Sequence, residues 1–124
     1  LPDTISSDLH AVSVNTPGTP VLPWVMSKFL ALGLDVEEVV RRATTSPARV
    51  IDRVEGLGTL SVGAPGDVSV LELVEEPVTF LDTAGEKLRG DRYFRPVTAV
   101  RAGRPFATPY PGPVPYPQPF GFPF

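Results

Sequence analysis

The 124-residue chain has no cysteine, a single histidine and no strong excess of either charge. Without cysteine there is no disulfide framework and no thiolate metal site, although this absence leaves the cellular compartment open. The formal net charge is −3 with acids and bases interspersed, so no basic face is offered to phosphate backbones and nucleic acid is not an expected partner. One histidine cannot supply the several ligands of a typical zinc site by itself.

Long hydrophobic runs are also missing. No apolar stretch approaches the roughly 18 residues that a membrane-spanning helix needs, so no membrane partner is expected. The chain begins at Leu1, and its visible start has no basic region leading into an apolar core, which is the pattern of a secretory signal. We therefore expect no leader or membrane anchor within the visible sequence, although a segment upstream of Leu1 could have carried a signal.

Two proton-handling side chains lie near the start of the chain. Residues 4–6 are compatible with a short β-strand, which is followed by the sequence Asp8-Leu9-His10. If the backbone stays extended, Asp8 and His10 point to one side because side chains alternate along a strand. Parallel α/β enzymes place their catalytic groups at the carboxyl ends of strands, so this pair is the candidate functional site.

Three short helices are predicted after a proline-rich loop at residues 11–23. The first helix runs from about Pro23 to Leu32 and is closed by Gly33. Asp35 is the expected N-cap of the second helix, and Ser46-Pro47 is the expected start of the third. Apolar residues at three- and four-residue spacing predict that these helices bury one face.

From about Gly56 the hydrophobic pattern changes from helical to alternating, which predicts a domain boundary between residues 52 and 57. The lone acid Asp67 is expected to hold a turn rather than to carry chemistry. The charges of residues 86–95 alternate in sign and are expected to form a solvated edge. Short strands are predicted at residues 58–63, 68–73, 78–81, 93–101 and 104–106.

Three stretches carry a resemblance to a known family. They are Asp3-Thr4-Ile5-Ser6-Ser7-Asp8-Leu9-His10, the helix start Ser46-Pro47-Ala48, and Leu60 to Val68. With them, about residues 1–106 resemble the C-terminal part of an amidohydrolase-superfamily metallohydrolase, in the amidohydrolase/deacetylase branch near dihydroorotase. At Gly66 the usual pattern of the family has alanine, a departure that is expected to loosen the turn without affecting chemistry.

The resemblance implies an α/β fragment with three parts. Residues 1–55 would be the last strand and helices of a (β/α)8 TIM barrel, and residues 56–106 a portion of a small flanking β-sandwich. A complete barrel needs roughly 250 residues, so the chain is expected to be a truncated product or a partial gene. Residues 107–124, which are rich in proline and aromatic residues and carry no charge, are expected to be a disordered tail.

The resemblance also implies an activity. Such enzymes are metal-dependent hydrolases that cleave non-peptide C–N bonds in cyclic amides or N-acyl compounds, using one or two divalent ions, here expected to be zinc. Asp8 would be the general base and then the acid, and would also touch a metal, while His10 would contact the substrate. Most metal ligands would lie upstream of Leu1, so the isolated chain is expected to be inactive. The full-length protein would take a small-molecule substrate in the cytoplasm, and a homo-oligomer is left open.

Other interpretations of the same residues remain open. The chain could be a non-catalytic, small β-rich binding module that presents its proline-rich tail to a partner, because about 106 residues are enough for a core. His10 could be a loop histidine without a role in binding. Arg49 could bind a substrate carboxylate, but a solvated helix arginine is the expected interpretation.

Overall fold

The computed structural model describes residues 1–8, 10, 21–82 and 84–106. Most of the loop predicted at residues 11–23 and the whole tail predicted at residues 107–124 lie outside the described residues. The described elements, in chain order, are α1 (Leu22–Ala31), α2 (Val36–Ala43), α3 (Thr45–Ile51), β1 (Val68–Val74), β2 (Val78–Leu81), β3 (Lys87–Gly90), β4 (Tyr93–Arg101) and β5 (Arg104–Phe106).

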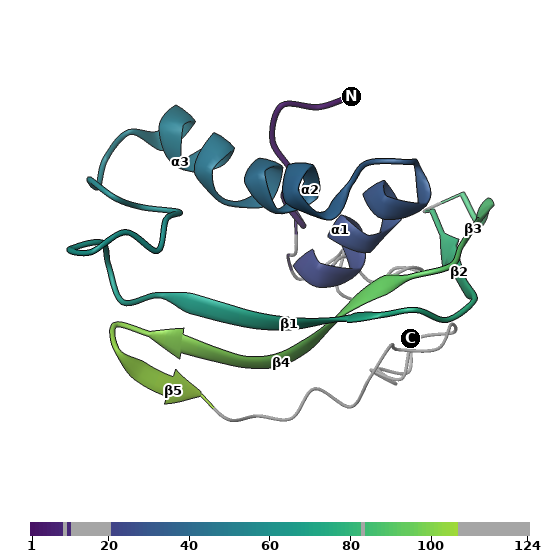
Figure 1. Ribbon diagram of the computed structural model, residues 1–124. Coiled ribbons are helices and arrows are strands. Elements are labelled where there is room, and N and C mark those ends of the chain that lie inside the picture. Colours follow the sequence, from purple (N-terminus) through teal and green to yellow (C-terminus); the bar gives the residue numbers. More distant parts are fainter. Residues whose placement is uncertain (9, 11–20, 83, 107–124) are drawn as a thin grey trace.

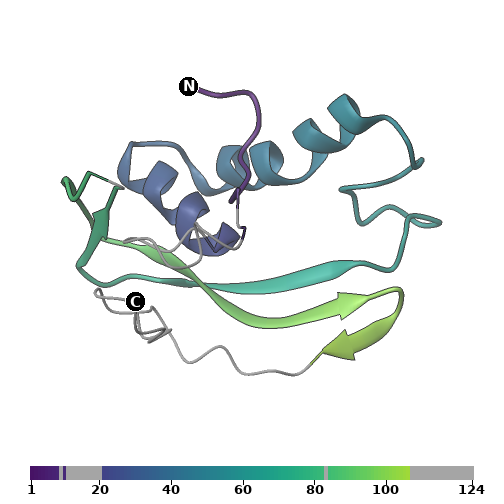
Figure 2. The same ribbon diagram turned by 180° about the vertical axis from the view of Figure 1, so that it is seen from behind.

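The strands form an antiparallel sheet in the order β1-β4-β5 and a separate β2-β3 hairpin. All three helices lie on one face of the larger sheet, as both views show (Figures 1 and 2). The N-terminal segment enters this helical layer, while β5 lies at the sheet edge away from the helices (Figure 1). Within the described ranges, no helix is long and apolar enough to cross a membrane.

Local signals set the ends of α1. A proline occupies its first turn, where the missing amide N–H costs no hydrogen bond. At the other end, Gly33 takes a φ of 94°, a left-handed conformation that favours glycine. Its amide donates to the Leu30 carbonyl (3.0 Å) and that of Leu34 to the Phe29 carbonyl (3.1 Å), which is the Schellman pattern of a helix C-terminus. The predicted helix is thus confirmed to within one residue at each end.

The caps of α2 and α3 had different outcomes. Asp35 caps α2 as predicted, because its carboxylate accepts the Glu38 amide at 2.7 Å. The expected cap of α3 at Ser46 is wrong, since α3 begins at Thr45 and no side chain caps it. The Ser46 hydroxyl instead accepts a hydrogen bond from the Arg41 guanidinium at 2.9 Å.

The main core joins the helices to the sheet. It contains buried side chains from the N-terminal segment, α1, α2, the turn between them and β4, namely Ile5, Met26, Leu30, Leu34, Val39 and Phe94. Ser27 is a fully buried polar residue of α1. Its hydroxyl donates to the Pro23 carbonyl (2.6 Å) and accepts the Phe94 amide (2.8 Å), so it connects α1 to β4 in the interior.

A second cluster attaches the β2-β3 hairpin to α1. Phe80 and Tyr93 are buried there, and the Trp24 ring lies 4.8 Å from the Phe80 ring and 6.1 Å from that of Tyr93, measured between centroids. Lys28 of α1 donates to the Leu81 carbonyl at 2.6 Å. Burial lowers the pKa of this lysine, and the negative charge of Asp82 offsets part of that shift. The Asp82 carboxylate accepts hydrogen bonds from the amides of Ala84 and Glu86, which stabilises the connection between β2 and β3.

The long β1-β4 ladder contains an irregularity at a proline. The register shifts between Val70 and Leu71, where Val70 pairs with Thr98 and Leu71 with Pro96. β4 is the central strand, and proline cannot donate to a ladder, so a bulge is where a proline is tolerated in such a strand.

Two predicted strands are wrong, and one strand was not predicted. Residues 4–6 form no strand; a strand needs a neighbour for its backbone groups, and the Ile5 amide donates to the Arg42 carbonyl in α2 instead (2.8 Å). Residues 58–63 form turns, because Gly58 and Gly63 take positive φ of 74° and 90°. β3, which was not predicted, lies within the charged stretch expected to be a solvated edge, and it pairs with β2. The strands predicted after Asp67 match β1, β2, β4 and β5.

Replacing the hydroxyl that links α1 to β4 is expected to destabilise the fold. Ser27→Ala leaves the buried Phe94 amide without its acceptor, a loss of about 1 to 2 kcal/mol after the better helix propensity of alanine is allowed for. Urea denaturation at fixed m measures this loss. The matched control is Ser61→Ala in the exposed loop, for which a change within about 0.5 kcal/mol is expected. Equal midpoints for the two variants would show that the Ser27 contact contributes nothing.

Candidate functional site

The candidate pair Asp8 and His10 lies at the surface. Asp8 Oδ2 and His10 Nε2 are 4.0 Å apart, with the Asp8 side chain 91% exposed and that of His10 54% exposed. Asp8 has a φ of 48°, so the extended backbone that was expected there is wrong. The two side chains nevertheless lie near each other, at the 4.0 Å separation of Asp8 Oδ2 and His10 Nε2.

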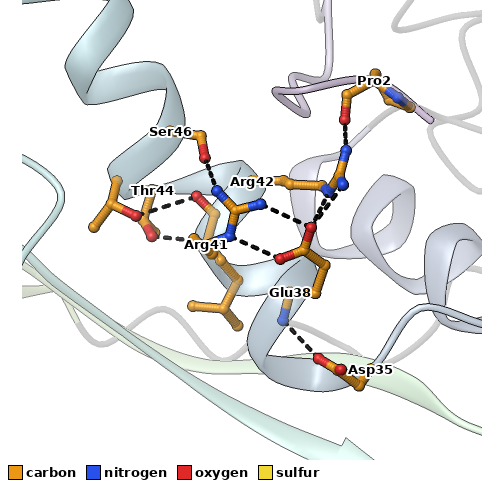
Figure 3. A network of polar contacts seen from close by, with 9 residues as sticks. Pro2, Asp35, Glu38, Arg41, Arg42, Thr44 and Ser46 are labelled. Atoms are coloured by element: carbon orange, nitrogen blue, oxygen red, sulfur yellow. Dashed lines mark hydrogen bonds and ion pairs between the residues drawn. The ribbon is translucent and has the colours of Figure 1, made fainter.

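The segment that carries Asp8 is anchored in the core. Ile5, with only 4% of its surface exposed, packs in the main cluster, and its amide donates to the Arg42 carbonyl. The Arg42 guanidinium donates to the Pro2 carbonyl. One residue of α2 therefore holds this segment through both its backbone and its side chain, as Figure 3 shows for the guanidinium.

A carboxylate in α2 orients that arginine. Glu38 accepts hydrogen bonds from Arg41 and Arg42, each at 2.7 Å, and the spacings i,i+3 and i,i+4 place all three on one helix face (Figure 3). These hydrogen bonds, first from Arg41 and then from Arg42, lower the pKa of Glu38 to about 2. The same contacts raise the pKa of Arg41. The contact of Arg42 with Pro2 joins residues 40 positions apart, so no local pattern in the sequence indicates it.

The described residues do not form a metal site by themselves. In the ranges that the structure covers, no group of three or more histidine, cysteine, aspartate or glutamate side chains is arranged to hold an ion. Asp8 and His10 supply two donors, whereas a zinc centre usually takes three or four protein ligands. The donor set of this part of the chain thus does not fit a complete metal centre.

The remaining candidates have structural surroundings. Asp67 precedes β1, and its carboxylate accepts hydrogen bonds from the Ala102 amide (2.7 Å) and the Arg101 guanidinium (2.9 Å). It therefore has a structural role in a turn, but this turn is the one between β4 and β5 and not its own local turn, which is where the role was expected. A Cβ at Gly66 would lie 3.1 Å from the Gly103 nitrogen, so the family's alanine would crowd this turn. Arg49 is exposed in the last turn of α3.

This arrangement of helices over an antiparallel sheet is similar to part of known hydrolase structures. No protein-family model matches the chain. A crystal structure of an adenine deaminase superposes with a TM-score of 0.76 at 22% identity, covering 86% of this chain and 28% of that one. A crystal structure of a dihydroorotase superposes with a TM-score of 0.73 at 37% identity and the same coverage. Both neighbours are members of the amidohydrolase superfamily.

Two curated relatives have matching sequences. Deacetylase Atu3266 of Agrobacterium fabrum is 39% identical over 100 residues, and a deacetylase of Brucella anthropi is 37% identical over 100 residues. Each alignment covers 81% of this chain, which spans about a quarter (24%) of either relative. The resemblance of the chain to the amidohydrolase superfamily is therefore confirmed, over a part of such proteins.

Acid should weaken the Glu38 cluster. A folded pKa of about 2, against an ordinary 4.5, means that the carboxylate stabilises the fold above about pH 4.5 and loses that contribution as the pH falls toward 2. The free energy of unfolding should thus fall more steeply over this interval for the natural chain than for Glu38→Gln, as measured by urea titrations at each pH. Glu37→Gln, which changes a carboxylate of the same turn, should retain the natural slope. Parallel curves for Glu38→Gln and the natural chain would contradict this.

The turn function of Asp67 is also testable. Asp67→Ala removes the acceptor of the Ala102 amide and should cost about 1 kcal/mol. Asp67→Asn retains one oxygen acceptor for that amide and should cost less, since only the exposed pairing with Arg101 is weakened. Thermal melts of the two variants distinguish these effects. An alanine variant as stable as the natural chain would mean that Asp67 does not hold the turn.

Proposed function

We propose that this chain is the C-terminal part of a metal-dependent amidohydrolase that cleaves non-peptide C–N bonds in cyclic amides or N-acyl compounds. The observation that carries the proposal is the 37–39% identity to two proteins named deacetylase and to a dihydroorotase of known structure. These names cover N-acyl compounds and a cyclic amide respectively, so the C–N bond is the shared chemistry. Because the chain spans only about a quarter of the curated relatives, the activity belongs to the whole protein.

In this proposal Asp8 is the general base and acid. Its carboxylate lies at the end of a core-anchored segment and is accessible, so it can accept a proton from an attacking water and return it to the leaving nitrogen. His10, 4.0 Å from Asp8, is close enough to contact the same substrate. The remainder of the barrel and of the β-sandwich would come from other parts of the protein.

We propose that one or two divalent metal ions, zinc in this proposal, are held mainly by residues outside this chain. Asp8 would contribute at most one ligand, consistent with the lack of a three-donor cluster in the described ranges. The isolated chain would then be inactive. A cytoplasmic location and a small-molecule substrate remain predictions of the resemblance, which leaves a homo-oligomer open. The alternative of a binding module rests on the tail, which lies outside the described residues.

Removing the base should abolish turnover without unfolding the protein. In the natural protein that carries this sequence, Asp8→Asn should lower kcat by about two to four orders of magnitude on an N-acyl amino acid or a cyclic amide, with an unchanged melting temperature. Asp3→Asn, an exposed acid in the same segment, is the matched control and should retain activity. Near-normal turnover by Asp8→Asn would remove Asp8 from the mechanism.

A further inference from the structure

We propose that Arg42 is a positioning residue for Asp8, acting through the N-terminal segment. This inference rests on the proposed function, because it gives Asp8 a task for which its position matters. Arg42 contacts Pro2 and Ile5, which precede Asp8 in the chain, so its effect on Asp8 is transmitted through the segment.

Three contacts hold the N-terminal segment in place ahead of Asp8. The Arg42 guanidinium holds the Pro2 carbonyl, the Arg42 carbonyl accepts the Ile5 amide at 2.8 Å, and the Ile5 side chain is buried in the core. Residues 1–8 have no strand partner among the described residues. Within this part of the protein, the contacts with Arg42 and the burial of Ile5 are therefore what holds the segment.

Arg42 is itself fixed before it reaches the segment. Its Nε donates to Glu38 at 2.7 Å, and only 14% of its side chain is exposed. A planar guanidinium can bind the carboxylate and a carbonyl together, whereas the point charge of a lysine holds its partners with less defined geometry. Glu38 is in turn held by Asp35 through its amide (Figure 3).

Arg41 provides a matched control within the same cluster. It pairs with the same Glu38 from the adjacent position, but its other end donates to Ser46 in α3 instead of Pro2 (Figure 3). The two arginines therefore share their electrostatic partner and differ in what they hold. A general loss of charge pairing would affect both variants alike, while loss of positioning would affect only Arg42.

The test compares Arg42→Ala, Arg42→Lys and Arg41→Ala in the natural protein that carries this sequence. Hydrogen exchange at the Ile5 amide should speed up about tenfold or more in Arg42→Ala and change little in Arg41→Ala. On an N-acyl amino acid, kcat should fall about 100-fold in Arg42→Ala with KM within about twofold, because the base is misplaced while substrate binding is retained. Arg42→Lys should recover part of both losses.

Three results would overturn the proposal. Ile5 exchange that is equal in Arg42→Ala and Arg41→Ala would show that the guanidinium does not hold the segment. Faster exchange with an unchanged kcat would show that the segment does not need to be held. If Arg42→Ala does not fold, Arg42→Lys replaces it, and natural exchange and kcat in that variant would likewise count against the proposal. The proposed function fails separately, through an active Asp8→Asn, and that result leaves the exchange measurement unaffected.

Discussion

The contact of Phe94 with the helical layer is the interaction on which the rest of the structure depends. The Phe94 side chain, 5% exposed, packs with Ile5, Met26 and Leu30, so it joins β4 to α1 and to the N-terminal segment. Its amide donates to the buried Ser27 hydroxyl. A buried amide without an acceptor would oppose folding, so the same residue needs both an apolar neighbourhood and one defined polar partner.

This packing also decides where the candidate site can lie. Ile5 is buried in the core, and Asp8 follows it three positions later in the chain with its side chain exposed at the surface. The position of Asp8 thus depends on α2, through Arg42 and Glu38, and on α1 and β4, through the core. The proposed catalytic residue therefore lies at the end of a segment that Arg42 of α2, 40 positions from Pro2 in the chain, helps to hold.

In the proposed enzyme, the metal ligands that the described residues do not supply lie outside this chain. The chain spans about a quarter of the curated deacetylases and 28% of the two similar crystal structures. A metal cage needs several ligands that converge from different strands. Two donor side chains in a short segment are consistent with one portion of a larger centre, which agrees with the proposal that the remaining ligands lie elsewhere in the protein.

Much of the local structure could be predicted from the sequence, and the errors have a common cause. The ends of α1 and the cap of α2 were predictable because Gly33 and Asp35 act on neighbouring backbone groups. The strands at residues 4–6 and 58–63 were wrong because a strand also requires a partner, which composition does not reveal. β3 was missed because its charges dominated the pattern, although its register with β2 is regular. The domain boundary between residues 52 and 57 stays a prediction.

Patterns within the sequence were enough to predict the helices, most strands and the resemblance that led to Asp8, since these depend on short-range order. The spacing of Glu38, Arg41 and Arg42 was also readable as ion pairing along a helix. Only the tertiary structure decided that Arg42 holds Pro2 and that Ser27 binds Phe94. The first contact joins residues 40 positions apart and the second joins residues 67 positions apart. Such contacts depend on how the helices and strands pack, which no local pattern specifies.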